Sequence, residues 1–316
     1  MHSESDSGSR VAVVDIGTNS TRLLIADVRD GRVEELDRRS EVCRLGEGVD
    51  STGRLGDEPI ARVVGTLEGF VEAIREKGAE RTVAVATSAV RDAENGDEFR
   101  ALLRERFDLD AQTISGEEEA RLTFLGATLG RGDGDDPVLV IDIGGGSTEF
   151  VIGPPGRPPS FHVSSRAGSV RQTERHLADD PPPREQLAGL GTEVREIVER
   201  DVPAGVRAEV SAGIAVAGTA TSLAAIDQEL DPFDPAKVHG YRLDVAACER
   251  MLGMLAARSE EERREVAGLD PARAPTIVAG AAILLESMRA FGLEELEVSE
   301  ADLLHGAALT SFRAVS

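Results

Sequence analysis

Apolar residues along the chain follow two patterns, short runs of strand length and longer stretches with helical spacing. "VAVVDI" (11–16) and "RLLIADV" (22–28) are apolar runs separated by a polar turn, which is typical of paired strands. Residues 60–74 instead carry their apolar side chains at helical spacing, and "FRALLRERF" (99–107) does so again. Strands and helices alternate in the same way beyond Val138. This alternation predicts an α/β protein.

One pattern occurs twice. "VVDIGTNSTRL" (13–23) and "VIDIGGGSTEF" (140–150) each contain an apolar strand that ends in Asp-Ile-Gly, a short polar turn, and a second strand. Between the two copies, "GRGDGDDP" (130–137) is rich in Gly and Asp and ends in Pro, as connectors do. The repeat predicts two related domains in tandem, each with its own hairpin.

The residue types in these hairpins suit phosphate binding. Glycines allow backbone N–H groups to approach an anion closely, so Gly144, Gly145 and Gly146 can wrap a phosphate, and Ser147 adds a hydroxyl. Asp142 at the strand end offers a hard oxygen ligand for Mg²⁺. The first hairpin offers a similar set: Asp15, Thr18, Asn19 and Ser20. A hairpin that merely contains glycine is the alternative for each copy alone, but two copies in matching contexts disfavour it.

Charge and composition narrow the class of protein. The formal net charge is −23, with 35 Lys and Arg residues against 58 Asp and Glu, which argues against general binding to nucleic acid or to anionic membranes. The N-terminus has no apolar signal core, and the longest apolar run, 274–285, is too short to span a bilayer. Cys43 and Cys248 fit no metal or redox spacing. We expect a cytoplasmic protein.

Further motifs carry a resemblance to a known family. Besides the two hairpins, these are "ATSAVRDAENGDEF", "ISGEEEARLTFLGA", "AGSVRQTERHL", "AGTATSLAAI", "VHGYRLD" and "APTIVAGAAILLESM". In this order, from about Val11 to Leu309, they resemble the exopolyphosphatase and guanosine pentaphosphate phosphohydrolase family of the actin, Hsp70 and sugar kinase superfamily. The resemblance implies two tandem actin-like (ribonuclease H-like) domains with a central cleft.

The resemblance also implies domain limits. Residues 1–10 would be a disordered tail, 11–132 the first domain, and 133–301 the second. The C-terminal helix, 302–316, would return to complete the first domain.

Individual roles follow from the resemblance as well. Glu119 matches the carboxylate that activates the attacking water, and Ser115 with Glu118 forms a capping-box pattern that starts its helix at about Glu117. A helix N-terminus that merely favours acidic residues is the alternative reading of these glutamates. The implied catalytic residues are Glu119, Asp142 and Arg91. The implied phosphate-binding residues are Thr18, Asn19, Ser20, Gly144, Gly145, Gly146, Ser147 and Arg171. The implied ligands for Mg²⁺ or Mn²⁺ are Asp15, Asp142 and Glu149.

The expected activity is hydrolysis of a phosphoric anhydride. The resemblance favours an exopolyphosphatase that removes terminal phosphate from polyphosphate. A preference for short chains is expected, because the chain lacks the additional helical domains of long family members. Guanosine pentaphosphate is the alternative substrate, and a sugar or acetate-type kinase or a non-catalytic regulator that binds alarmone or polyphosphate are further alternatives. A homodimer stays open.

Overall fold

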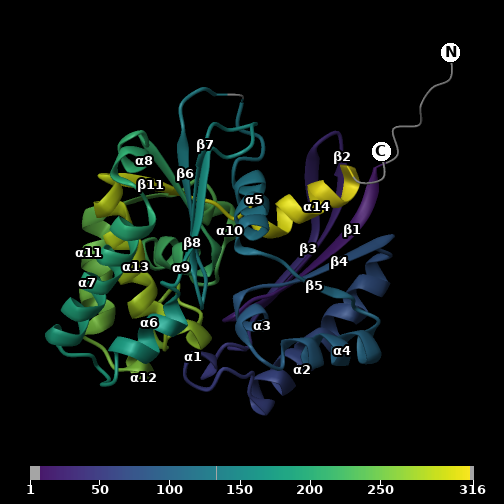
Figure 1. The fold of residues 1–316 in the computed structure, drawn as a ribbon, viewed down its shortest axis with the longest axis horizontal. Helices are drawn as coiled ribbons and strands as arrows, with labels where there is room; N and C mark the ends of the chain where they lie inside the picture. Colours follow the sequence, from purple (N-terminus) through teal and green to yellow (C-terminus); the bar gives the residue numbers. More distant parts are fainter. Residues whose placement is uncertain (1–7, 133, 314–316) are drawn as a thin grey trace. The chain divides into compact units, whose positions relative to one another are not determined.

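The computed structural model describes residues 8–132 and 134–313, which fall into two compact units. Unit 1 comprises Met1–Ser115 and Leu303–Ser316, and unit 2 comprises Gly116–Asp302 (Figure 1). Most of the predicted N-terminal tail lies outside the described residues. The remainder was predicted wrongly, because Ser9 and Arg10 already belong to the first strand, where they pair with Val28 and Asp27.

Unit 1 consists of one sheet and the helices on its two faces. Its elements are β1 (Ser9–Ile16), β2 (Ser20–Arg29), β3 (Arg32–Val42), α1 (Val49–Thr52), α2 (Asp57–Lys77), β4 (Arg81–Ala86), α3 (Ser88–Asp92), α4 (Gly96–Phe107), β5 (Ala111–Thr113) and α14 (Leu303–Arg313). The described strands are ordered β3-β2-β1-β4-β5. β1, β2 and β3 are antiparallel neighbours, whereas β4 and β5 run parallel to β1.

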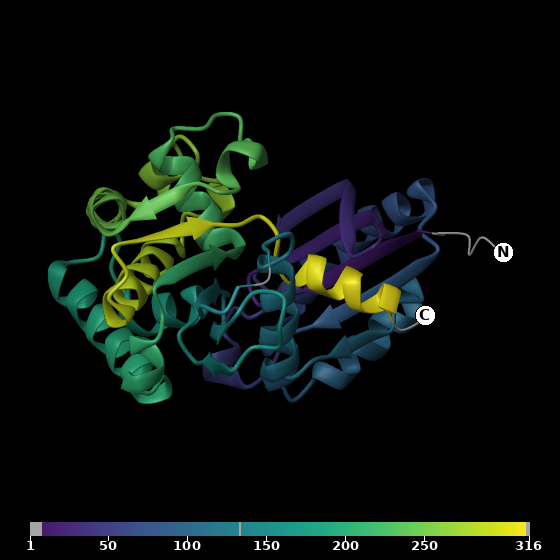
Figure 2. The same cartoon turned by 90° about the horizontal axis from the view of Figure 1, so that it is seen from above.

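The central strand of unit 1 is buried on both faces, and this explains its nearly continuous apolar sequence. Ala12, Val14 and Ile16 pack in one cluster with the apolar side of α2. Side chains alternate across a strand, so Val11 and Val13 point to the other face. That face is covered by α14, which lies along β1 and β2 in both views (Figures 1 and 2).

Unit 2 repeats this plan with a larger helical layer. Its elements are α5 (Gly116–Ala127), β6 (Val138–Ile143), β7 (Thr148–Gly153), β8 (Phe161–Ser165), α6 (Ser169–His176), α7 (Arg184–Asp201), α8 (Ala204–Ala208), β9 (Ala212–Val216), α9 (Ala217–Asp227), α10 (Pro235–Val238), β10 (Arg242–Asp244), α11 (Val245–Ala256), α12 (Glu260–Arg263), the 3₁₀ turn η1 (Pro271–Arg273), α13 (Ile277–Phe291) and β11 (Glu295–Val298).

The strand order of unit 2, β10-β11-β9-β6-β7-β8, repeats that of unit 1 apart from the added β10. In each unit the first strand pairs antiparallel with the second and parallel with the fourth. The duplicated hairpin motif therefore reflects a duplicated sheet. The fold is the predicted α/β class, with two sheets of matching strand order.

One helix moves the boundary between the units to an earlier position than the sequence predicted. α5 follows β5 in the chain, but Ala120, Phe124 and Ala127 pack with Val140 and Val151 of the second sheet. This apolar contact assigns the helix to unit 2, so the boundary lies at Ser115 and Gly116 instead of residue 132. Among the described helices, none has both the length and the apolar character needed to span a bilayer.

Candidate active site

The phosphate hairpin of unit 2 is closed by one backbone hydrogen bond. The N–H of Gly144 donates to the carbonyl of Ser147 at 3.0 Å, directly after β6 and before β7. Gly145, Gly146 and Ser147 are buried between the two strand ends. The apolar strands thus hold the glycine turn in a fixed place at the edge of the core.

The start of α6 fixes the carbonyl groups of this hairpin. The N–H groups of Ser169 and Val170 donate to the carbonyls of Gly144 and Gly145, both at 2.9 Å, and Arg171 Nε donates to the carbonyl of Gly146 at 2.8 Å. Gly168 permits this approach, because a Cβ there would lie 2.2 Å from the carbonyl oxygen of Gly145.

This arrangement sets the direction of three backbone N–H groups. In a planar trans peptide the C=O and the N–H point in opposite directions. The carbonyls of residues 144, 145 and 146 point at α6 and Arg171, so the N–H groups of Gly145, Gly146 and Ser147 point away from them. Successive N–H groups that point to one side form an anion-binding concavity. The hairpin therefore presents the donors that a phosphate oxygen requires.

Two carboxylates lie beside this hairpin on one face of the sheet. Asp142 on β6 is directly opposite Glu149 on β7, and Glu149 is opposite Ser164 on β8. Ser164 Oγ donates to Glu149 Oε1 at 2.7 Å. Asp142 is 6% exposed and Glu149 1%, so both acids are withdrawn from water.

α5 places a third carboxylate over the same face. Thr123 Oγ1 donates to Asp142 Oδ2 at 3.4 Å, and Glu119 lies one turn earlier on the same side of the helix. Glu119 is 7% exposed. Its neighbour Glu118 is instead ion-paired at the surface with Arg121, and this hydrogen-bonded pair lowers the pKa of Glu118. Of the three glutamates in the first turn, Glu119 is the one that the fold buries.

The close approach of α5 depends on a glycine. A Cβ at Gly116 would lie 2.8 Å from the Cβ of Ser164, which is closer than two carbon atoms normally come. Gly116 thus lets the helix begin directly on β8. As a result, the first turn of α5, with Glu119, is held against the strands that carry Asp142 and Glu149.

The hairpin of unit 1 closes in the same way. The N–H of Gly17 donates to the carbonyl of Ser20 at 3.0 Å. Thr18 Oγ1 lies 2.8 Å from Ser88 Oγ, which joins the hairpin to the start of α3. Asn19 is buried, and its carbonyl accepts the N–H of Arg44 at 2.8 Å. Thr18, Asn19 and Ser20 therefore lie together at the carboxyl end of β1.

The predicted catalytic arginine is also in unit 1, at the end of α3. Arg91 Nη1 donates to the carbonyl of Ile114 at 2.9 Å, and its side chain is 27% exposed. This contact orients the guanidinium without burying it. The structure thus groups Asp15, Thr18, Asn19 and Ser20 in unit 1, and Glu119, Asp142, Glu149, Gly144, Gly145, Gly146, Ser147 and Arg171 in unit 2.

Corresponding positions of the two hairpins differ in charge. Asp15 is opposite Arg22 in the first hairpin, whereas Asp142 is opposite Glu149 in the second. Arg22 Nε and Nη2 both donate to Asp15 Oδ2, at 2.8 and 2.6 Å. The aspartate of unit 1 is therefore neutralised by a cation, while that of unit 2 has another acid beside it.

The sequence did not indicate three of these positions. Thr123, Ser164 and Gly116 act through contacts between α5 and the strands, which only the fold brings together. Thr123 had a partial signal, since it lies one turn after Glu119 in a helix that the sequence predicted. Within residues 8–132 and 134–313, no group of three or more His, Cys, Asp or Glu side chains converges tightly enough to hold a metal ion on its own.

Known proteins match nearly the whole chain. The model of the Ppx/GppA phosphatase family matches residues 24–313. "Exopolyphosphatase 2" of Mycobacterium tuberculosis is 38% identical over 96% of this chain and 98% of its own length. The crystal structure of an exopolyphosphatase-like protein superposes with a TM-score of 0.91 at 34% identity, covering 98% of this chain and 99% of the other.

A family member from Aquifex aeolicus superposes with a TM-score of 0.81 at 30% identity, covering 98% of this chain and 99% of that one. These full-length matches are consistent with the fold, in which two sheets share one strand order and each carries a hairpin of the same motif. The chain belongs to the Ppx/GppA phosphatase family.

Proposed function

We propose that the protein is an exopolyphosphatase, which hydrolyses the terminal phosphoanhydride bond of inorganic polyphosphate. The observation that carries this proposal is the pinned hairpin of unit 2, whose amides at Gly145, Gly146 and Ser147 point to one side beside buried carboxylates. Phosphoryl transfer requires positioning and neutralised charge more than covalent chemistry. A fixed row of N–H donors positions the phosphate and offsets its negative charge without moving during the reaction.

Glu119 is the proposed general base. Its burial on a helix that packs on β8 holds the carboxylate in one place, as a base needs. Water loses a proton to this carboxylate as its oxygen attacks the terminal phosphorus. The bond to the bridging oxygen breaks, and the chain leaves shortened by one phosphate. A positioned base of this kind contributes about 10²- to 10⁴-fold to the rate.

Asp142 and Glu149 are the proposed ligands for Mg²⁺ or Mn²⁺. Two adjacent buried carboxylates repel each other unless a cation neutralises them, and their oxygens are the donors that hard divalent ions prefer. A bound divalent ion would offset the negative charge of the phosphates. Thr123 and Ser164 orient the two carboxylates through their hydroxyl groups. The metal role predicted for Asp15, which is held by Arg22, stays a prediction.

In unit 1, Thr18, Asn19, Ser20 and Arg91 remain the proposed phosphate-binding residues, with Arg91 aiding catalysis. Arg91 is the best placed of these for charge neutralisation, since its guanidinium is anchored at the Ile114 carbonyl and still partly exposed. Arginine suits this task because its planar group can donate two parallel hydrogen bonds to phosphate oxygens.

The test is a comparison of substrates. The purified protein is incubated with tripolyphosphate, longer polyphosphate, guanosine pentaphosphate and ATP, each with Mg²⁺ and with a chelator, and phosphate release is followed over time. We expect steady release from polyphosphate that depends on the metal, and a gradual ladder of shorter chains. Release from guanosine pentaphosphate alone would replace the proposed substrate. Release that requires a sugar or acetate acceptor would indicate a kinase and overturn the proposal.

A further inference from the structure

Arg171 on α6 is a buried cation that contacts the backbone of the phosphate hairpin in unit 2. Its Nε donates to the carbonyl of Gly146 at 2.8 Å, and the residue is only 7% exposed. The side chain of Arg91, which is proposed to meet phosphate in unit 1, is 27% exposed. Burial, and to a lesser extent the charge of Arg175, lowers the pKa of Arg171. The fold thus withdraws this guanidinium from water and directs one of its donors at the hairpin backbone.

The hydrogen bond from Arg171 sets the orientation of one peptide group. The carbonyl of Gly146 and the N–H of Ser147 belong to the same planar trans peptide, in which the two groups point in opposite directions. Arg171 Nε therefore lies on one side of this peptide, and the Ser147 N–H points to the other side. A phosphate oxygen that accepts this N–H would be separated from Arg171 Nε by the peptide itself.

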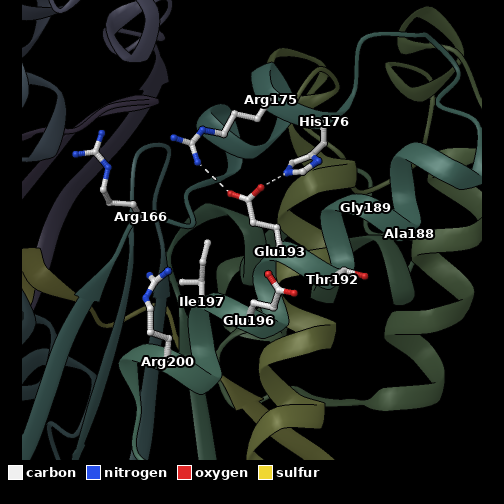
Figure 3. A pocket seen from close by; sticks show the side chains of 10 residues that line it. All are labelled: Arg166, Arg175, His176, Ala188, Gly189, Thr192, Glu193, Glu196, Ile197 and Arg200. Carbon is white, nitrogen blue, oxygen red and sulfur yellow. Dashed lines mark hydrogen bonds and ion pairs between the residues drawn. The ribbon is translucent and has the colours of Figure 1, made fainter.

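The helix that carries Arg171 is attached at both ends. Its first turn donates hydrogen bonds to two carbonyls of the hairpin, as described above. At its last turn, Arg175 Nη1 contacts Glu193 Oε1 at 3.0 Å, and His176 Nε2 lies 2.6 Å from Glu193 Oε2 (Figure 3). Glu193 belongs to α7, so this contact joins the two helices. A donor on a helix that is held in this way can keep a peptide in one orientation during the reaction.

We propose that Arg171 is a positioning residue, which holds the Gly146 carbonyl so that the Ser147 N–H points at the substrate phosphate, and that it does not bind phosphate itself. Glycine has access to more backbone conformations than other residues, so the peptide after Gly146 needs a fixed partner to keep one orientation. A backbone donor contributes to catalysis when it is fixed at the place where charge develops. This inference rests on the proposed function, because it specifies how the hairpin of that site is oriented.

Three substitutions separate the hydrogen bond of Arg171 from its charge. Gln Nε2 is the same number of bonds from Cα as Arg Nε, so Arg171→Gln retains a donor at this place and loses the charge. Lysine has a carbon atom there, so Arg171→Lys keeps the charge and loses the donor. Arg171→Met loses both, and it replaces the lysine variant in the comparison if circular dichroism shows that a buried ammonium group prevents folding. Arg175→Gln is the control, because it removes a charge one turn along the same helix from a residue that pairs with Glu193 (Figure 3).

We expect kcat for phosphate release from tripolyphosphate to fall roughly 10- to 100-fold in Arg171→Lys and Arg171→Met, and to stay within about threefold of wild type in Arg171→Gln. Arg175→Gln should stay within about twofold, since exposed ion pairs contribute little. A direct phosphate contact, the role expected from the sequence, predicts the opposite order, because charge strengthens hydrogen bonds to phosphate. That opposite order, equal losses in all three Arg171 variants, or wild-type kcat in Arg171→Met would each refute the positioning role.

Calorimetry distinguishes a failure of this inference from a failure of the proposed function. A wild-type protein that releases no phosphate from polyphosphate would refute the exopolyphosphatase assignment, yet its binding of tripolyphosphate still tests Arg171. The dissociation constant should rise about tenfold in Arg171→Met and less than about threefold in Arg171→Gln, because misaligned N–H groups bind phosphate less tightly. A larger rise in Arg171→Gln than in Arg171→Lys would refute the positioning role. A wild-type protein that neither hydrolyses nor binds tripolyphosphate would refute both proposals.

Discussion

Replacing Gly116 by alanine tests whether the contact between α5 and β8 positions Glu119, the proposed catalytic carboxylate. The new Cβ would lie 2.8 Å from the Ser164 Cβ and 3.3 Å from its Oγ. Carbon atoms in ordinary contact are separated by about 3.5–4.0 Å, so the helix start or the strand must move by roughly 0.7–1.2 Å. Glu119 lies in the same first turn and moves with it.

The expected effect falls on catalysis more than on stability. Displacing a catalytic group by about 1 Å can lower the rate by ~10²-fold. Overpacking costs about 1–3 kcal/mol, and the better helix propensity of alanine returns up to ~1 kcal/mol. We therefore expect kcat for phosphate release to fall roughly 10- to 100-fold, with at most about 3 kcal/mol lost from the free energy of unfolding measured in urea.

Two further variants serve as controls for this prediction. Gly69→Ala is the control, because Gly69 lies within α2 and a Cβ there meets no atom within 4 Å. It should leave kcat unchanged and stabilise the protein slightly. Gly116→Ala combined with Ser164→Gly removes the close contact but also the Ser164 hydroxyl that donates to Glu149 Oε1 at 2.7 Å, so it should regain at most part of the activity that Gly116→Ala loses. A Gly116→Ala protein with wild-type kcat would refute the claim that this contact positions Glu119.

Four other outcomes are expected. Glu119→Gln should lower kcat by ~10²- to 10⁴-fold, while calorimetric binding of polyphosphate persists. Glu117→Gln, at the same helix start, should leave kcat nearly unchanged. Comparable activity in the two variants would contradict the assignment of Glu119 as the general base. Chelation of divalent ions should abolish phosphate release and added Mg²⁺ should restore it, and activity that survives the chelator would exclude a metal at Asp142 and Glu149. Burial raises the pKa of Cys248 to about 12, so Cys248 in the folded protein should resist alkylation by iodoacetamide at pH 8, as measured by mass spectrometry of that residue. The protonated thiol of Cys248 should contribute its full share of the free energy of unfolding below about pH 9, and this share should be lost as the pH rises towards 12. When the free energy of unfolding is measured across that pH range, the loss should be smaller in Cys248→Ala.

The sequence predicted the parts of the fold that local patterns specify. Both hairpins follow from apolar runs and glycine position, and the start of α5 follows to within one residue from the capping-box pattern of Ser115 and Glu118. The end of unit 1 was not predicted correctly. The composition of the chain changes at "GRGDGDDP", but the packing of Phe124 decides which sheet α5 joins. A helix after a strand contacts whichever sheet buries its apolar side best, and no pattern within the helix shows which sheet that is.

The candidate site shows the same division. The Asp and Gly residues of the hairpins were visible as a motif, since the turn itself requires them. Ser164, which donates a hydrogen bond to Glu149, was not visible in the sequence, because only the pairing of β7 with β8 brings the two residues together.

The two copies of the hairpin differ in the charge that stands opposite the aspartate. Both copies keep the aspartate on the first strand, and both keep the glycine and the serine whose backbone hydrogen bond closes the turn. The position opposite the aspartate is free of that constraint, and it became Arg22 in one copy and Glu149 in the other. Arginine at this place neutralises Asp15, whereas glutamate places a second carboxylate beside Asp142, and this is the pair proposed above to hold a divalent ion. The two copies thus share one backbone turn and differ in the charge of a single cross-strand neighbour, which is why the proposed metal ligands lie in unit 2 and are not repeated at the same position in unit 1.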